Sequence, residues 1–484
     1  MEKMLRTVNA PCGAGKTSAQ CEHIANLFRG RGGRFLYIVP TIDLSDQIKS
    51  TLKRFGVHPN TIHNIHSDKT CPSVSNKVIQ VAEDLNRERF GVLIIQLEAL
   101  KILPYCPIKG DWQVIIDEVP QIDTYHRLEV PYYHNIVREF IELGDQVNGD
   151  LYEVKLKCNS SAIEVIHRVR DDYNNIHRAL IQQLLNGEKC YTLKDNWDRM
   201  DRKEICREKL ELGNDKNTLH FLCMLPPDRF LLSENTTLMG SNINYSICQK
   251  YWQERCNIRF EENTDIKLQF RRHENGHLVD IKWLLHENYS KYYRDMPIND
   301  DDTIGQDCHR RAIEYFRKLG GDMVYVLNND EKDLAFGTRI KPGLFGLNCY
   351  SSYNNLYYGV SLNRCPMHAK MLGLLDFSKE FIDRATVCES AYQAALRLSI
   401  RDPDIKERVN LVIISKDPAH SVKKLLPHST IGPLDDQCKR IKKVPKTRTE
   451  IMQTYRAKSF IEKKVPKTST ERSREHRARK RQKP

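Results

Sequence analysis

The chain has 484 residues, 40% hydrophobic and 29% charged, which leaves room for the cores of two to four domains. Its longest apolar run, Val92–Ile95, is too short to span a bilayer, and its 15 cysteines are scattered without a C-x-x-C pair, which is typical of reduced thiols. These features exclude membrane-spanning and disulfide-rich secreted classes and predict an intracellular, cytoplasmic protein, or a nuclear one in a eukaryotic host.

A glycine-rich loop stands near the start, between the apolar run Met4–Val8 and the helix-like stretch Ser18–Phe28. A strand, loop and helix in this order can hold a nucleotide triphosphate, because the amides at the helix N-terminus face the phosphates. Lys16 would reach the β and γ oxygens, and Thr17 would offer its hydroxyl to Mg²⁺. The residues expected to bind ATP are Ala10, Gly13, Ala14, Gly15, Lys16 and Thr17.

Two further buried strands follow in the first half. Phe35–Val39 ends in Pro40-Thr41 and precedes an apolar pattern with helical spacing. The β-branched run Val114–Ile116 ends in Asp117 and Glu118. Because ligands gather at the carboxyl ends of strands in open α/β sheets, both acids should face the phosphate loop. Residues 125–228 are charged and contain Tyr and Asn, and we expect a largely helical insertion there, in which one amphipathic helix is indicated by Val137, Phe140, Ile141 and Leu143.

The second half contains weaker blocks and one distinctive segment. Leu238–Asn242 could be a polar turn or a motif, and Val324–Asn328 predicts the first strand of a second sheet. Residues 391–401 predict a helix with Gln393, Arg397 and Arg401 at i, i+4 and i+8. With about 3.6 residues per turn, these side chains would share one face of that helix.

The C-terminal tail carries nearly all of the net charge of +13. Residues 441–484 contain 16 Lys and Arg against 4 Asp and Glu, and KKVPKTRTE at 442–450 recurs as KKVPKTSTE at 463–471. Such a segment is expected to be disordered until it binds a polyanion, although a solubilising tail or a nuclear-import address is an alternative. The residues expected to contact nucleic acid there are Lys442, Lys443, Lys446, Arg477, Arg479, Lys480 and Arg481.

Together these blocks resemble superfamily 2 helicases, the DEAD and DExH group, and in particular the compact helicases of phages, plasmids and viruses. The loop fits A-x-x-G-x-G-K-T, and Asp117-Glu118 stand at the DExx position. Residues 35–41 resemble motif Ia, and 391–401 resemble motif VI, Q-x-x-G-R-x-x-R. Two departures occur in motif VI: Leu396 replaces the Gly, and Arg401 lies one residue later than the usual second Arg.

The resemblance implies roles for single residues. Asp117 would hold Mg²⁺ together with Thr17, and Glu118 would activate the attacking water. Arg397 would be the arginine finger across a domain cleft, beside Gln393 and Arg401, while Arg401 could instead pair with Asp402 or Asp404. Pro40 and Thr41 would touch the nucleic-acid backbone. Cys12, inside the loop at a helix N-terminus, is expected to be unusually acidic.

The expected architecture is α/β, with two tandem RecA-like parallel-sheet lobes, ATP between them and a disordered basic tail. The expected boundaries are 1–240 for the first lobe with its insertion at 125–228, 241–430 for the second lobe, and 431–484 for the tail. We expect an ATP- and Mg²⁺-dependent helicase or translocase acting on nucleic acid, DNA rather than RNA, with replication proteins as candidate partners. The alternatives are a packaging-type or other P-loop ATPase motor, and a nucleic-acid-binding protein with a degenerate ATP site.

Overall fold

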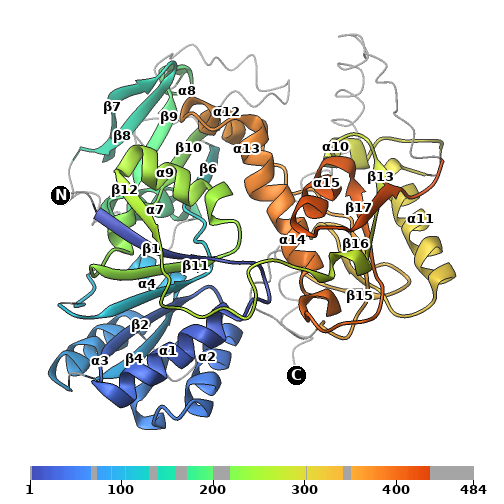
Figure 1. Cartoon of the computed structure of the whole chain (residues 1–484). Helices are drawn as coiled ribbons and strands as arrows, with labels where there is room; N and C mark the ends of the chain where they lie inside the picture. Colours follow the sequence, from blue (N-terminus) through green and yellow to red (C-terminus); the bar gives the residue numbers. More distant parts are fainter. Residues whose placement is uncertain are drawn as a thin grey trace, which may run out of the picture. The chain divides into compact units, whose positions relative to one another are not determined.

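The computed structural model describes residues 3–66, 73–88, 90–103, 105–108, 110–129, 140–157, 172–199, 218–300, 302–341 and 350–436. These residues all belong to one compact unit of the chain. Their strands form three sheets, which we call A, B and C (Figure 1).

Sheet A is the first RecA-like sheet, and all its strand pairs are parallel. Its strands, in spatial order, are β12 (Ile258–Glu262), β1 (Lys3–Asn9), β11 (Asn235–Gly240), β5 (Gln113–Asp117), β2 (Arg34–Val39), β4 (Gly91–Gln96) and β3 (Ile62–Ile65). The central strands are continuous apolar runs because both faces of the sheet are covered. Since β11 lies between β1 and β5, three chain segments leave the same edge side by side.

Helices cover the two faces of sheet A. One face packs on α1 (Lys16–Gly30) and α2 (Ile42–Arg54). The other packs on α3 (Val74–Glu88), α4 (Leu97–Ile102) and α9 (Ile247–Cys256). Strand β12 pairs with β1 after this last helix. The first sheet therefore extends past the boundary expected at residue 240.

The interval 125–228 contains a sheet, so the expectation of a largely helical insertion is wrong. Sheet B is antiparallel, with the order β6 (Asp123–Glu129), β10 (Thr218–Met224), β9 (Lys189–Leu193), β8 (Leu151–Leu156) and β7 (Ile141–Asn148). Two helices accompany it, α7 (Asp172–Leu185) and α8 (Lys194–Arg199). Ile141 and Leu143, which we assigned to a helix, lie two residues apart on β7, the spacing that places side chains on one face of a strand.

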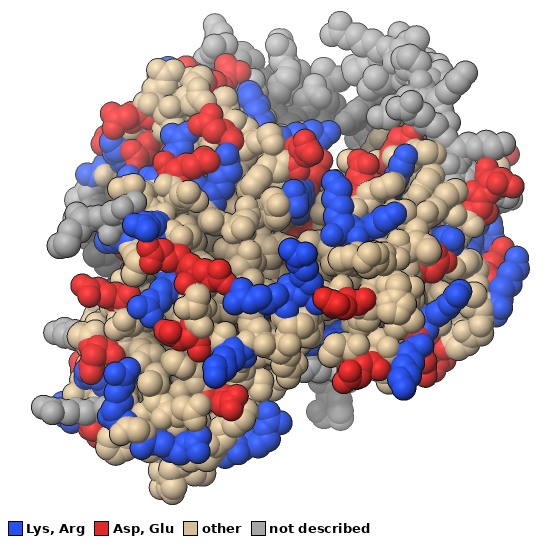
Figure 2. All heavy atoms as spheres, viewed as in Figure 1, with Lys and Arg blue, Asp and Glu red and all other residues tan. Residues whose placement is uncertain are grey.

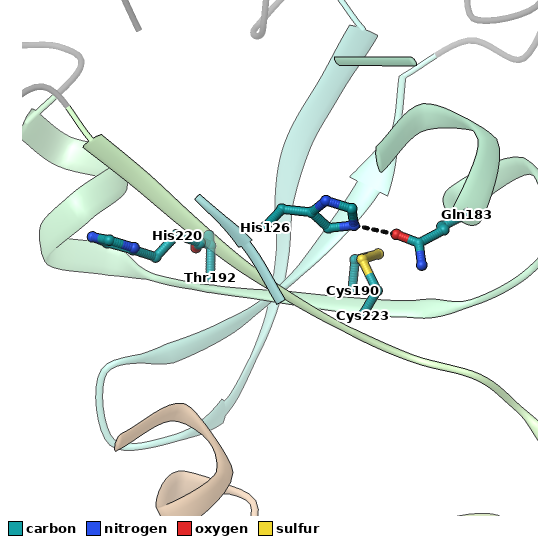
Figure 3. Close-up of a disulfide and its surroundings, with 6 residues drawn as sticks. All are labelled: His126, Gln183, Cys190, Thr192, His220 and Cys223. Carbon is teal, nitrogen blue, oxygen red and sulfur yellow. Dashed lines mark hydrogen bonds between the residues drawn. A yellow bond between two sulfur atoms is a disulfide. The ribbon is translucent and has the colours of Figure 1, made fainter. Parts of the chain in front are cut away.

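Sheet B also corrects the expectation that all cysteines are reduced. Cys190 on β9 and Cys223 on β10 are paired residues of neighbouring strands, and their sulfur atoms form a disulfide (Figure 3). Both side chains are buried, with the hydrogen-bonded pair His126 and Gln183 nearby. The disulfide thus joins the two strands inside the core of the insertion.

Sheet C is the second RecA-like sheet, again with only parallel pairs. Its order is β15 (Thr338–Arg339), β14 (Val324–Val326), β16 (Asn355–Tyr358), β17 (Val409–Ser415), β13 (Val279–Leu285) and β18 (Thr430–Pro433). The predicted strand at 324–328 is confirmed as β14, but it is not the first strand, because β13 precedes it in the chain. The two parallel sheets confirm the predicted pair of RecA-like lobes.

The faces of sheet C are covered by helices of the second lobe. One face packs on α10 (Lys291–Arg294) and α11 (Ile304–Leu319). The other packs on α14 (Glu389–Ala395) and α15 (Lys416–Leu425). Helices α12 (Pro366–Leu374) and α13 (Lys379–Asp383) lie between β16 and α14, and α12 packs near β9 and β10 of sheet B (Figure 1).

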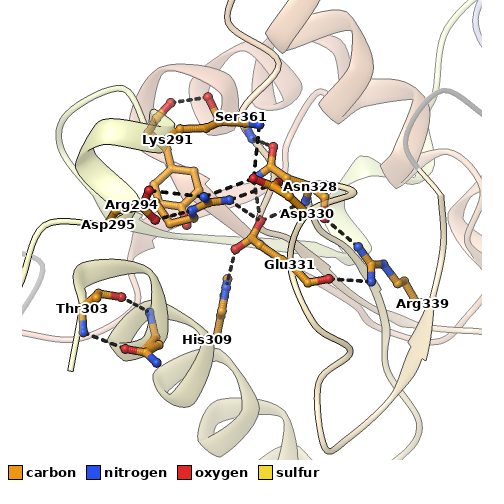
Figure 4. A network of polar contacts seen from close by, with 12 residues as sticks. Lys291, Arg294, Asp295, Thr303, His309, Asn328, Asp330, Glu331, Arg339 and Ser361 are labelled. Carbon is orange, nitrogen blue, oxygen red and sulfur yellow. Dashed lines mark hydrogen bonds and ion pairs between the residues drawn. The ribbon is translucent and has the colours of Figure 1, made fainter. Parts of the chain in front are cut away.

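A polar network fixes the loops at the carboxyl edge of sheet C (Figure 4). Glu331 accepts hydrogen bonds from the backbone N–H of Asn328 at 3.0 Å and lies 2.9 Å from His309 Nε2. The Asn328 Oδ1 atom accepts from the backbone N–H of Ser361 at 3.2 Å, and Arg339 donates to the Glu331 carbonyl at 2.9 Å. The loops that follow β14 and β16 are therefore tied together.

The segment expected to be one helix at 391–401 is not. Helix α14 ends at Ala395, Leu398 is extended, and Ser399–Arg401 forms a 3₁₀ turn. Beyond the helix end, Leu396, Arg397, Leu398 and Ile400 are all buried, so burial no longer follows a helical period. Gln393, Arg397 and Arg401 therefore do not share a helical face.

Charge on the described residues is mixed. Figure 2 shows Lys and Arg side chains interspersed with Asp and Glu over the face in view. Among the described residues no helix is long and apolar enough to cross a membrane. The seven basic residues expected to grip nucleic acid, all in 441–484, lie outside the described residues.

Candidate nucleotide site

The phosphate loop follows β1 as predicted, and two of its glycines are required by its shape. Gly13 and Gly15 have φ of 86° and 77°, the left-handed region that favours glycine. A Cβ on Gly13 would lie 2.6 Å from Arg401 Cγ, and one on Gly15 would lie 3.0 Å from Gln269 Cδ. The loop is thus packed between residues of the second lobe and of the segment that connects the lobes.

The lysine, hydroxyl and carboxylate predicted to handle phosphate and metal are brought together. Lys16 Nζ crosses the loop and donates to the carbonyls of Ala10 and Pro11, at 2.8 and 3.0 Å. Thr17 Oγ1 donates to Asp117 Oδ2 at 2.8 Å, and Tyr37 donates to the same oxygen at 3.1 Å. An adjacent hydroxyl and carboxylate are the oxygen donors that Mg²⁺ prefers, so this pair fits a magnesium site.

Burial, followed by the charge of Glu118, raises the pKa of Asp117 to about 6. Thr17, Lys16 and Tyr37 act in the opposite direction, because each favours the ionised carboxylate. Within the described residues no cluster of three or more His, Cys, Asp or Glu is arranged to hold a metal, so the only metal-ligand pair we identify is Thr17 with Asp117.

Glu118 adopts an unusual backbone conformation at the end of β5. Its φ is 86°, and its N–H donates to the Met239 carbonyl on the neighbouring strand at 3.0 Å. Left-handed conformations of non-glycine residues cost energy and concentrate at functional sites. Glu118 lines a cavity of about 1080 Å³ that is also lined by Asn242, Gln393 and Arg397. The structure therefore brings the predicted base and the predicted finger to one cavity.

The two predicted arginines occupy different places. Arg397 is buried and lines the cavity with Glu118, whereas Arg401 lies against Gly13 of the phosphate loop. No ion pair between Arg401 and Asp402 or Asp404 occurs among the described residues. Motif spacing favoured Arg397 as the finger, but Arg401 is the arginine that contacts the loop.

Glu389 is a central residue of the site that sequence reasoning missed. Its Oε1 accepts hydrogen bonds from Ser241 at 2.7 Å and Gln393 at 3.0 Å, and its Oε2 accepts from Asn242 at 2.7 Å. Burial raises the pKa of this carboxyl, although all three hydrogen bonds favour its ionised form. Glu389 follows directly on the π-helical turn Arg384–Cys388, a feature frequent at functional sites. It joins the segment after β11 to the helix that leads to Arg397.

The expectation that the Cys12 thiol is unusually acidic is wrong. Burial raises the pKa of its thiol to about 11, and the opposing charge of Lys16 does not compensate. Its Sγ lies 3.6 Å from the Ser241 hydroxyl. The desolvation of this thiol outweighs the effect of the helix N-terminus, from which we predicted acidity.

The Pro40-Thr41 pair is found where the motif Ia resemblance places it, at the end of β2. Thr41 is the N-cap of α2, and its hydroxyl accepts from the Leu44 N–H at 3.3 Å. This capping role gives the residue a structural function in addition to any contact with nucleic acid.

A buried ion pair also links the second lobe to the start of sheet B. Asp123, which is buried, pairs with Arg364 and lies 3.0 Å from His368 Nε2 on α12. His368 stacks on Tyr125 of β6 with ring centroids 5.0 Å apart. The segment after the Asp117-Glu118 strand is therefore held to the loop that follows β16.

Comparisons with known proteins bear on the first lobe. Residues 3–144 match the family model described as Type III restriction enzyme, res subunit, a stretch that contains the phosphate loop, Asp117 and Glu118. No curated protein matches the sequence significantly.

Three solved structures match this chain at low sequence identity. Mss116p, bound to ssRNA and AMP-PNP, is 10% identical, with 89% of this chain and 71% of that chain covered and a TM-score of 0.34. T4 UvsW is 11% identical, with 94% and 71% covered and a TM-score of 0.24. Dbp5 of S. cerevisiae, bound to RNA and ADP with beryllium fluoride, is 9% identical, with 94% and 89% covered and a TM-score of 0.31.

Proposed function

We propose that this chain is a motor that unwinds nucleic acid or translocates along it, with DNA preferred over RNA. Its residues 3–144 are those of an ATP-hydrolysing protein of the superfamily 2 helicase type. The observation that carries the proposal is the hydrogen bond from Thr17 to Asp117, with Glu118 in the next position. It unites a phosphate loop with an acidic strand end at one edge of sheet A. A simple glycine-rich turn would not need this pairing.

The chain's own residues supply the steps of hydrolysis. Amides of the phosphate loop and the Lys16 ammonium would bind the β and γ phosphates at the N-terminus of α1. Thr17 and Asp117 would hold Mg²⁺, which when bound neutralises charge on the phosphate oxygens. Glu118 would take a proton from the attacking water, and it lines the same cavity as Arg397.

The second lobe is proposed to complete the site. Arg397 would stabilise the charge of the transition state from within the cavity, and Arg401, in the 3₁₀ turn Ser399–Arg401, would contact the phosphate loop. Glu389 would hold the Ser241–Asn242 segment and Gln393 in fixed positions relative to each other. Through these hydrogen bonds, nucleotide hydrolysis at sheet A would be transmitted to the second lobe.

DNA is proposed over RNA because the basic tail is of a general kind and no RNA-reading module is visible in the sequence. Residues 441–484 carry 16 basic and 4 acidic side chains, whereas the rest of the chain is nearly neutral, and such a tail would bind any polyanion without reading its sequence. Replication proteins are proposed partners of such a motor. Pro40 and Thr41 would add backbone contacts from the first lobe.

The test is an ATPase assay with single-stranded and double-stranded DNA and RNA, each titrated to saturation. We expect hydrolysis that rises several-fold with nucleic acid, most with DNA, and strand displacement of a partial duplex by the same protein. An equal rise with RNA would remove the DNA preference. ATP binding without hydrolysis would favour a nucleic-acid-binding protein with a degenerate site, and hydrolysis without any stimulation would favour a different P-loop motor.

A further inference from the structure

The segment 263–278, which connects β12 with β13, lies against the phosphate loop. The Gln269 N–H donates to the Ala14 carbonyl at 3.1 Å. Six residues later, Asn275 Nδ2 donates to the carbonyls of Ile400 and Asp402, at 3.0 and 2.8 Å. This connecting segment therefore touches both the phosphate loop and the turn that carries Arg401.

His273 occupies the middle of this contact and has an unsatisfied atom. The side chain is only 3% exposed, packs between Phe270 and Tyr392, and hydrogen bonds with the backbone of Cys12. Its Nε2 atom is buried and has no hydrogen-bond partner among the described residues. Such an orphan polar atom costs free energy unless a ligand or another group satisfies it.

The charges around His273 favour an anion. Burial first, then Lys16 and Arg401, lower the pKa of the imidazole to about 4, so the ring is neutral at neutral pH. The other titratable groups packed around it, Cys12 and Tyr392, are neutral there too, because burial raises both of their pKa values. The surroundings of the ring thus contain two cations and no compensating negative charge from these groups.

We propose that His273 is a phosphate contact of the nucleotide site, contributed by the segment between the lobes, and that its Nε2 donates a hydrogen bond to a phosphate oxygen of a bound nucleoside di- or triphosphate. This inference rests on the proposed nucleotide site at Lys16. It adds a ligand-binding residue that lies outside every motif found in the sequence.

A proton accompanies the contact. The neutral ring hydrogen bonds with the Cys12 backbone, and Nε2 can donate to an oxygen only after it takes up a proton from solvent. Phosphate charge would offset Lys16 and Arg401 and stabilise the imidazolium, so nucleotide binding raises the pKa of His273. Nucleotide binding therefore consumes a proton, and nucleotide affinity rises as the pH falls toward the raised pKa of His273. The opposite pH dependence would be expected if the His273 imidazolium only repelled Lys16.

The experiment uses the full chain and ADP as the probe. Calorimetric titration at pH 6.5 in buffers of different ionisation enthalpy gives the protons taken up per ADP bound. Histidine-selective NMR of the same protein follows the His273 C2–H resonance from pH 5 to 8 with and without ADP. The wild type should take up more protons than His273→Gln, which keeps a neutral donor, and its C2–H titration should move to higher pH with ADP but not with AMP.

Two variants separate the contact from folding and from the site itself. His273→Phe, which retains a ring but no nitrogen, should weaken ADP binding by about tenfold, the scale for losing a hydrogen bond to a charged group. His277→Gln changes an exposed histidine of the same segment and should match the wild type in both readouts. This inference would be overturned if the titration of His273 did not change with ADP while the wild type bound ADP and Lys16→Ala did not. That outcome would leave the proposed nucleotide site standing. Unchanged ADP binding by Lys16→Ala would overturn both.

Discussion

Replacing Glu389 by alanine should disconnect the two lobes while leaving the phosphate loop in place. The carboxylate accepts hydrogen bonds from Ser241, Asn242 and Gln393 over distances of 2.7 to 3.0 Å and so joins these three donors. Ser241 and Asn242 follow β11, directly beside the loop, and Gln393, on α14, lies four residues before Arg397. The substitution should therefore displace Arg397 relative to Glu118.

The magnitudes follow from these contacts. Three hydrogen bonds at a net of about 1 kcal/mol each give a loss of about 3 kcal/mol in the free energy of unfolding, reduced by relief of the cost of burying the carboxylate. A displacement of about 1 Å in a catalytic group costs on the order of 10²-fold in rate. We expect kcat to fall by that order while KM for ATP, which depends on Lys16 and the loop, changes little.

Steady-state ATPase kinetics and urea unfolding measure the two effects on one preparation. Glu389→Gln is the matched intermediate: it keeps one acceptor oxygen, presents an amide to the Asn242 amide, and should lie between wild type and Glu389→Ala in both measurements. Glu314→Ala, at an exposed position on α11, controls for loss of an acidic side chain. Wild-type kcat in Glu389→Ala would refute the proposed link between lobes, even if stability fell.

Three other predictions concern separate parts of the chain. A protein ending at Asp436 should keep its maximal nucleic-acid-stimulated rate but need more nucleic acid to reach half of it, with a flatter salt dependence because fewer counterions are released; an unchanged half-saturation point would make the tail an address or a partner site. Arg397→Ala should lower kcat by on the order of 10³-fold, the scale for arginine fingers, with ATP affinity nearly kept, and an equal or larger loss in Arg401→Ala would assign the finger to the arginine that touches Gly13. Peptide mapping without reduction should recover Cys190 and Cys223 as a linked pair, and recovery of both as free thiols would contradict the disulfide in sheet B.

The phosphate loop and its acidic partner could be predicted because they are local patterns. Val114–Ile116 and Phe35–Val39 are continuous apolar runs, as parallel strands buried on both faces must be. The carboxyl ends of such strands meet at one edge, so the contact between Thr17 and Asp117 followed from topology alone. No comparable pattern or motif spacing in the sequence indicated β12 or β13.

The insertion and the arginine segment were misread for different reasons. In the insertion, apolar residues recur two apart at Ile141 and Leu143, yet we counted only the three- and four-residue spacings of a helix. In the arginine segment the helix ends at Ala395, and residues 391–401 contain no Gly or Pro that would indicate that end.

Glu389 and His273 could not have been found from the sequence. Glu389 lies 148 residues from Ser241, and its role depends on a tertiary contact. His273 owes its interest to burial and to an unpartnered nitrogen, neither of which a single sequence reveals. Residues that join elements distant in the chain can be identified only from the folded structure.

We propose that Glu118, at the end of β5, activates water for hydrolysis of ATP held by the phosphate loop. The most direct measurement compares Glu118→Gln with wild type in two assays: equilibrium binding of ATP and its hydrolysis at saturating nucleic acid. We predict that the glutamine variant binds ATP as tightly as the wild type and has almost no turnover, because the amide keeps the shape of the side chain but cannot accept the proton. Normal hydrolysis by Glu118→Gln would contradict the assignment of this strand end as the catalytic one.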